Sequence, residues 1–204
     1  MKIGLVSALY PPDFRGGATL VCENLAADLA DLGEVCAVFS GRTTAAEPEG
    51  AVATGRVGAA ETWAVNVGGA LHSWSPQGYW NPIASRSFAD FCRVHEPEVV
   101  HIHSLQGLGA GLLGVARDAG AAVVVTMHDW WWQCPCLFRL SPDGRICDDP
   151  ARPAQCSGVT GFDFERPRSI LAAALRDADR IWCPRTSRVR AWRREASNAA
   201  VSRC

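Results

Sequence analysis

The sequence has almost no net charge and no long apolar run. Its 20 basic and 21 acidic residues give a formal net charge of -1, so no overall field favours nucleic acid or an anionic membrane. The most apolar stretch, residues 105–127, is interrupted by Arg117 and Asp118, and neither part is long enough to cross about 30 Å of hydrocarbon. The start, MKIGLVSALYPP, is too short before Pro11 for the apolar region of a secretory signal. We therefore expect a cytoplasmic protein.

Nine cysteines are present, but a disulfide framework is not expected. Their number is odd, and a chain without a secretory signal keeps its thiols reduced in the cytosol. A hydrophobic content of 48% in 204 residues supplies enough apolar surface for a core. We expect residues 1–204 to form a single folded domain.

Apolar, β-branched runs alternate with helical patterns along the chain. Strands are predicted at 2–8, 35–39, 62–67, 99–103, 123–127 and 180–183, and helices at 18–32, 83–95, 105–120, 165–177 and 186–197. The Ala/Gly/Glu-rich stretch 44–60 is interpreted as a surface loop. Strand–helix alternation of this kind predicts an α/β fold with a doubly wound, mostly parallel sheet and helices on both faces, a Rossmann-like domain.

Ligands of such sheets bind outside the carboxyl ends of the strands. The first strand is followed there by Gly16 and Gly17 and then by a helix. Backbone N–H groups of glycines and the positive end of a helix can hold an anion such as a phosphate. The alternative is that the two glycines simply form the turn into the helix.

A second glycine pattern, GAGLLG at Gly109–Gly114, matches the dinucleotide fingerprint, with Asp129 at nearly the right distance to hold a ribose. However, SLQGL separates it from the preceding strand. We therefore interpret these glycines as close-packing positions against the sheet, and a nucleotide-dependent oxidoreductase is the less favoured alternative.

Histidines stand at the carboxyl ends of two predicted strands. His101 and His103 alternate with apolar residues, so both imidazoles leave the strand on one face, and His128 closes the next strand. Neutral imidazole both donates and accepts hydrogen bonds, which suits sugar hydroxyls and acid–base chemistry. Asp129 could orient a hydroxyl or the imidazole, or it could cap a turn.

Two long stretches carry a resemblance to a known family. They are MKIGLVSALYPPDFRGGATLVCENLAADLADLG and PEVVHIHSLQGLGAGLLGVARDAGAAVVVTMHDWWWQCP, followed by a DRIWCP strand. In this order they resemble the N-terminal domain of retaining glycosyltransferases with the GT-B fold, the group called glycosyltransferase family 4. The likeness runs from Lys2 to about Arg194.

The resemblance implies transfer of a sugar from a nucleotide-sugar donor to a glycan or glycolipid acceptor, with retention of configuration. It implies that Gly16 and Gly17 lie near the donor phosphates, that His128 is the catalytic residue beside the transferred sugar, and that His103 lines the acceptor side. Asp129 and Trp130 are further candidates for sugar contacts. No metal is required for catalysis in such enzymes.

The family's second, donor-binding domain does not follow Cys204. We therefore expect a fragment, a truncated product or half of a split enzyme, inactive without a C-terminal donor-binding domain. A non-catalytic module that binds a glycan or a protein partner is the main alternative.

A cysteine-rich loop is expected at about 130–160. Cys134, Cys136, Cys147 and Cys156 lie in it, but their spacing is not that of common zinc ribbons. A structural zinc ion, a disulfide and unlinked thiols all remain open.

Aromatic and basic residues add two further candidates for binding surfaces. Trp130, Trp131 and Trp132 could stack on sugars, although three consecutive residues cannot share one face and at least one should be core; an apolar face around them would favour self-association. The arginine-rich helix at 186–197 could rest on anionic headgroups at the inner face of the membrane, or it could simply be solvated.

Overall fold

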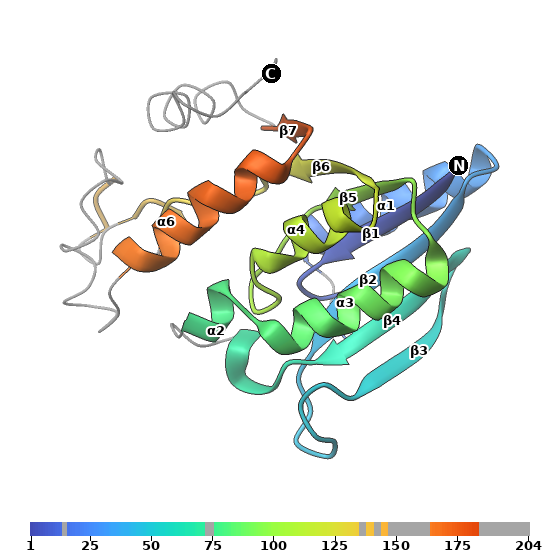
Figure 1. Ribbon diagram of the computed structural model, residues 1–204, viewed down its shortest axis with the longest axis horizontal. Helices are drawn as coiled ribbons and strands as arrows, with labels where there is room; N and C mark the ends of the chain where they lie inside the picture. Colours follow the sequence, from blue (N-terminus) through green and yellow to red (C-terminus); the bar gives the residue numbers. More distant parts are fainter. Residues whose placement is uncertain (14–15, 72–75, 135–137, 141–143, 147–163, 184–204) are drawn as a thin grey trace.

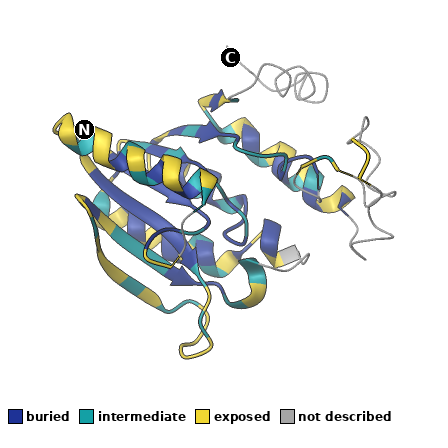
Figure 2. Ribbon diagram, turned by 180° about the vertical axis from the view of Figure 1, so that it is seen from behind, coloured by how far each residue is buried: buried dark blue, intermediate teal, exposed yellow. Residues whose placement is uncertain are grey.

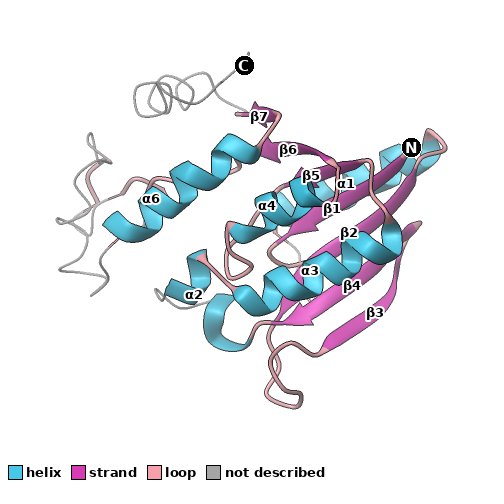
Figure 3. Ribbon diagram, in the orientation of Figure 1, coloured by secondary structure: helices cyan, strands magenta, loops and turns pink. Residues whose placement is uncertain are grey.

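The computed structural model describes residues 1–13, 16–71, 76–134, 138–140, 144–146 and 164–183. Its centre is a seven-stranded sheet in the order β3-β4-β2-β1-β5-β6-β7, drawn in Figure 3. The strands are β1 (Lys2–Ser7), β2 (Val35–Arg42), β3 (Val52–Val57), β4 (Ala60–Asn66), β5 (Val99–Ile102), β6 (Ala122–Thr126) and β7 (Arg180–Trp182). The helices are α1 (Gly17–Asp31), η1 (Gly68–Leu71), α2 (Pro76–Tyr79), α3 (Pro82–His95), α4 (Gly111–Asp118), α6 (Glu165–Ala174) and η2 (Leu175–Asp177).

The doubly wound α/β prediction is confirmed. The β3–β4 pair is antiparallel and the other strand pairs are parallel. From β1 the chain winds first outward to β2 and then, on the other side, to β5, so the strand order reverses beside β1. A reversal of this kind opens a crevice at the carboxyl ends of the two strands that flank it.

Helices cover both faces of the sheet, as Figures 1 and 2 show. Helix α1 packs on β1, β2 and β4, where Leu5 and Val38 join a smaller apolar cluster. Helices α3, α4 and α6 lie on the opposite face, over the larger cluster that contains Phe39, Phe88 and Ile102. Helix α1 ends as predicted, because Gly33 adopts a left-handed conformation with φ 84° just beyond it.

The interpretation of residues 44–60 as a surface loop is wrong in its second half. Residues Val52–Val57 form β3, the edge strand that pairs with β4 through a turn at Gly58. The strand is missed in the sequence because it has no buried side chain and therefore no apolar alternation. An edge strand is stabilised by backbone hydrogen bonds to its single neighbouring strand, so its sequence need not alternate between apolar and polar residues.

The predicted helix at 105–120 is shorter than expected. Helix α4 begins at Gly111, because Gly107 and Gly109 have φ values of 75° and 81°, which no α-helix contains. The apolar residues before it, including Leu105 and Leu108, are buried in a loop. Their spacing in the sequence resembles that of apolar residues on the buried face of a helix. The helix predicted at 186–197 lies outside the described residues.

Candidate functional site

The residues singled out at strand ends converge on one edge of the sheet. His103 directly follows β5, His128 lies two residues beyond β6, and α1 begins beyond the neighbouring strand β1. Parallel strands β1, β5 and β6 are adjacent, so their carboxyl ends lie side by side at the reversal of strand order. This edge is the candidate site.

His103 and His128 are in direct contact. Nδ1 of His103 is 3.0 Å from Nε2 of His128, and the two rings are nearly parallel, with 5.2 Å between their centroids. His103 is 3% exposed, whereas His128 is half-buried. The sequence predicted that both would lie in one site, but it did not predict the bond between them.

His101 joins the same row, as its alternation with apolar residues predicts. Its ring centroid is 4.3 Å from that of His103, and its Nε2 is 2.8 Å from the hydroxyl of Thr126 on β6. Burial, together with the nearby His128, lowers the pKa of His101 to about 4. Burial, followed by the effect of His101 and His128, lowers the pKa of His103 to about 3. Both side chains are therefore neutral imidazoles at neutral pH.

Asp129 has a structural role in the turn that follows His128. Its Oδ1 accepts a hydrogen bond from the backbone N–H of Trp131 at 2.9 Å, and its Oδ2 accepts one from Gln106 at 3.2 Å. The capping alternative for Asp129 therefore matches the structure. Gln106 is a site residue that the sequence analysis missed, because a lone glutamine in a loop carries no motif.

The three consecutive tryptophans have different environments, as expected. Trp131 and Trp132 are each 5% exposed, and Trp131 stacks on Tyr79 with 5.2 Å between the ring centroids. Trp130 is half-buried, with the guanidinium of Arg139 over its ring at 4.7 Å. The rings of Trp131 and Trp132 are core residues and therefore do not contribute to the expected apolar face around Trp130–Trp132.

The Gly16–Gly17 pair forms the start of α1. Gly16 precedes the helix with an extended backbone and no side-chain cap, and the first turn contains no acidic residue. A Cβ atom added at Gly17 would meet no atom within 4 Å, so there is open space beside the backbone at Gly17. The positive end of α1 therefore lies at the candidate edge, and the first turn of the helix supplies no carboxylate to neutralise it.

The glycines of GAGLLG have packing roles, but not the role predicted. A Cβ at Gly109 would lie 2.5 Å from the backbone nitrogen of Asn81, and one at Gly111 would lie 2.8 Å from Oγ of Ser85. Gly109 and Gly111 therefore pack closely against the start of α3 rather than against the sheet.

Most of the predicted cysteine site lies outside the described residues. Cys136, Cys147 and Cys156 are not described, and Cys134 is buried. In the described part of the chain, no group of three or more His, Cys, Asp or Glu side chains could hold a metal ion. The zinc prediction is thus untested, and near-stoichiometric zinc in the purified protein, by elemental analysis, would support it.

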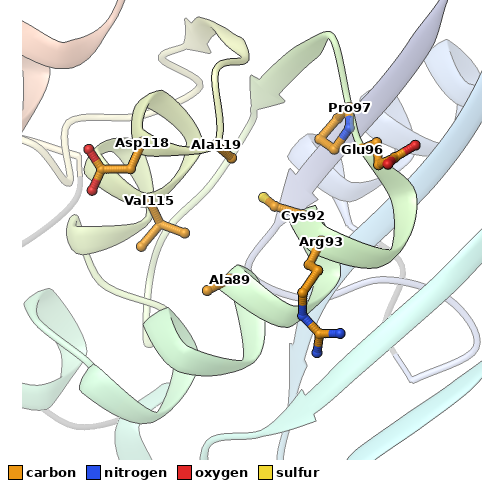
Figure 4. A pocket seen from close by; sticks show the side chains of 8 residues that line it. All are labelled: Ala89, Cys92, Arg93, Glu96, Pro97, Val115, Asp118 and Ala119. Carbon is orange, nitrogen blue, oxygen red and sulfur yellow. The ribbon is translucent and has the colours of Figure 1, made fainter.

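Two hollows open between the elements. One, of about 650 Å³, lies between α3 and α4 at the amino ends of the strands, away from the histidines; Figure 4 shows Arg93, Glu96 and Asp118 around it. Burial raises the pKa of Cys92, which lines it, to about 12, so the thiol is not a nucleophile. The other, of about 450 Å³, lies at the carboxyl edge, between the end of β4 and the start of α3.

None of the described helices is both long and apolar enough to span a bilayer.

None of the curated protein sequences matches this chain. Among solved structures, the α,α-trehalose-phosphate synthase (UDP-forming) of Burkholderia xenovorans, in complex with glucose-6-phosphate, is 12% identical with a TM-score of 0.52, and the match covers 97% of this chain and 44% of that one. The corresponding synthase of Burkholderia vietnamiensis is 13% identical, also with a TM-score of 0.52, over 96% and 43% of the two chains.

At these identities the two synthases share the fold with this chain, which spans less than half of their length. The family itself is shown by a sequence model, Glycosyltransferase Family 4, that matches residues 15–197. That range includes the start of α1, the paired histidines and the cysteine-rich loop. The chain belongs to Glycosyltransferase Family 4.

Proposed function

We propose that this chain is the acceptor-side half of a retaining glycosyltransferase that uses a nucleotide-sugar donor. The observation that carries the proposal is the contact between His103 and His128, at the carboxyl ends of adjacent strands and at the sheet edge where α1 begins without a side-chain cap. Imidazoles and a positive helix end at one edge of the sheet suit a ligand that combines hydroxyl groups with phosphate.

Each candidate residue has a role in this proposal. The N–H groups at Gly16 and Gly17 bind the donor phosphates, and the positive end of α1 stabilises the charge that develops on the leaving diphosphate. His128 lies beside the transferred sugar and binds one of its hydroxyl groups. Transfer through such contacts needs no metal ion at the diphosphate.

The acceptor belongs on the side of His103, Asp129 and Trp130 in this proposal. A synthase of similar fold was solved in complex with glucose-6-phosphate, so a sugar or sugar phosphate is the first acceptor class to test. Asp129 acts through the turn that it caps, and Trp130 offers an aromatic face beside Arg139. A lipid-linked sugar is the second acceptor class.

The test is ligand binding followed by transfer. Glucose-6-phosphate and a panel of nucleotide-sugars are titrated into the chain by calorimetry, with the wild type compared with His128→Asn and with His95→Asn. His95 is a matched control because it packs between Trp63 and Phe91, in contact with neither strand-end histidine. Binding that is at least tenfold weaker in His128→Asn and unchanged in His95→Asn supports the proposed site, and equal binding by all three proteins contradicts it.

A further inference from the structure

The bond between the two strand-end histidines restricts where their protons can lie. Nδ1 of His103 and Nε2 of His128 are 3.0 Å apart, so one of these nitrogens carries a hydrogen and the other accepts it. His103 is buried, and its low pKa leaves it one ring proton at neutral pH. The pair therefore has two arrangements, which differ in the direction of the bond.

The other ring nitrogen of His103 distinguishes the two arrangements. Nε2 of His103 is buried and has no hydrogen-bond partner among the described residues. If His128 donated, the single proton of His103 would lie on Nε2, as a buried N–H group without an acceptor. Orphaned buried N–H groups are rare in folded proteins, because a buried donor without an acceptor loses the hydrogen bond that water gives it in the unfolded chain. If His103 donates through Nδ1, its Nε2 is a bare acceptor and no N–H group is orphaned.

We infer that His103 is a positioning residue, which donates Nδ1–H to Nε2 of His128 and thereby holds neutral His128 in the tautomer protonated on Nδ1. His103 is well suited to this role, because its backbone N–H is fixed to the carbonyl of Val6 on β1 at 2.8 Å. The ring lies beside that of His101, which is itself held by Thr126. The donor is thus fixed by two neighbouring strands.

The fixed tautomer sets what His128 can offer a ligand. With Nε2 used as an acceptor, Nδ1 of His128 is an N–H donor and suits an oxygen atom that accepts a hydrogen bond. Given the proposed function, on which this step rests, that atom is a hydroxyl oxygen of the transferred sugar. The same tautomer prevents neutral His128 from acting as a base through Nδ1, because that nitrogen already carries its proton.

The tautomer can be measured directly in the 204-residue chain by ¹⁵N NMR of its histidine rings, at a pH where the rings are neutral. A His128→Asn spectrum identifies the His128 signals by their loss. We expect Nδ1 of His128 to show the shift of a protonated ring nitrogen and Nε2 that of a bare one. The opposite pattern in the wild type would overturn the inference without any variant.

Two substitutions test whether His103 is the cause. His103→Leu removes the donor, so the His128 shifts should move toward the pattern of free histidine, in which the Nε2–H form predominates. His103→Asn keeps an N–H donor at about the same position and should restore the wild-type pattern. His95→Asn, at a ring that packs on Trp63 and Phe91, is the matched control and should leave it unchanged. If His103→Leu does not fold, the wild-type spectrum still tests the tautomer of His128.

An unchanged His128 tautomer in folded His103→Leu would overturn the positioning role. The readout needs neither donor nor acceptor, so it is separate from the proposed function. If the expected NMR pattern is observed but no sugar binds, the inferred tautomer stands and only the proposed sugar contact is refuted.

Discussion

Buried polar side chains fix the loops at the carboxyl edge of the sheet, residue by residue. Asn66, at the end of β4, is 1% exposed. Its Oδ1 accepts from the backbone N–H groups of Thr44 and Gly68, and its Nδ2 lies within 2.8–3.2 Å of the carbonyl oxygens of Thr44, Glu47 and Pro48. One amide therefore holds the loop after β2 against the segment after β4.

Asn66→Ala is expected to lower the free energy of unfolding by about 2–3 kcal/mol, because several buried backbone groups lose their partners. Asn66→Asp should cost more, since a carboxylate has no N–H to donate and would face three carbonyl oxygens. Urea unfolding checks both. Thr43→Ala in the same loop removes an exposed hydroxyl bonded to Gly68 and should cost less than about 1 kcal/mol. Equal effects of Asn66→Ala and Thr43→Ala would contradict this account.

The buried histidines predict a pH dependence of stability. Burial lowers the folded-state pKa of His101 to about 4 and of His103 to about 3, below the value of about 6.5 in an unfolded chain. Below pH 6.5 the unfolded chain therefore binds protons that the folded chain does not. The free energy of unfolding should fall as the pH decreases from 6.5 toward 4, by up to about 1.4 kcal/mol per pH unit for each histidine.

Urea unfolding between pH 7 and 5 measures this slope before most carboxylates titrate. His101→Gln removes one of the titrating groups and should make the slope shallower. The slope should not vanish, since His103 remains and burial lowers the pKa of His95 too. A wild-type stability that stays level down to pH 5 would show that these histidines protonate in the folded protein.

At the scale of elements, the loop from β5 to α4 is shaped by two glycines. Gly109 has φ 81° and forms an antiparallel bridge with Trp80, just before α3. Gly120, beyond the end of α4, has nearly the same φ of 83° but no atom within 4 Å of an added Cβ. The two positions thus have the same backbone conformation and different surroundings.

Gly120→Ala should lower the free energy of unfolding by about 1 kcal/mol, the cost of a left-handed alanine. Gly109→Ala should cost about 3 kcal/mol or more, because its Cβ would also lie 2.5 Å from the backbone nitrogen of Asn81 and 2.9 Å from Cα of Trp80. Thermal or urea unfolding compares the pair. Similar losses in both variants would mean that the contact with α3 relaxes easily.

At the scale of the whole molecule, the chain supplies a sheet with one candidate ligand-binding edge. It spans 44% and 43% of the two synthases of similar fold. The groups at this edge that could hold a diphosphate are the N–H groups at the start of α1, in the described part of the chain. Electrostatic stabilisation of the leaving group is commonly the largest catalytic contribution, and a helix end alone supplies little of it.

We therefore expect the purified 204-residue chain to transfer no sugar by itself. Turnover is expected only when a separately expressed donor-binding domain from a relative is added, and it should be lost in His128→Ala. Product formation from a panel of nucleotide-sugars is measured by mass spectrometry, for the chain alone and for the mixture with the donor-binding domain. Transfer by the chain alone that disappears in His128→Ala would show that this half suffices.

Much of the site was predictable because it depends on position in a parallel sheet. His103 and His128 end predicted strands, and the carboxyl ends of adjacent parallel strands must lie together. The 3.0 Å bond between them was not predictable, because it depends on rotamers and on the stagger of β5 and β6. Gln106 was missed for a similar reason, since its contact with Asp129 joins two loops.

The sequence by itself determined the α/β alternation, the six strands with buried apolar residues and the end of α1 just before Gly33. These features arise from local periodicity and from the conformational freedom of single residues. Tertiary structure alone decided the pairing of β3, the left-handed turns before α4 and the burial of Trp131 and Trp132. It also decided which nitrogens of His103 meet a partner, because a buried donor or acceptor is satisfied by groups distant in the sequence.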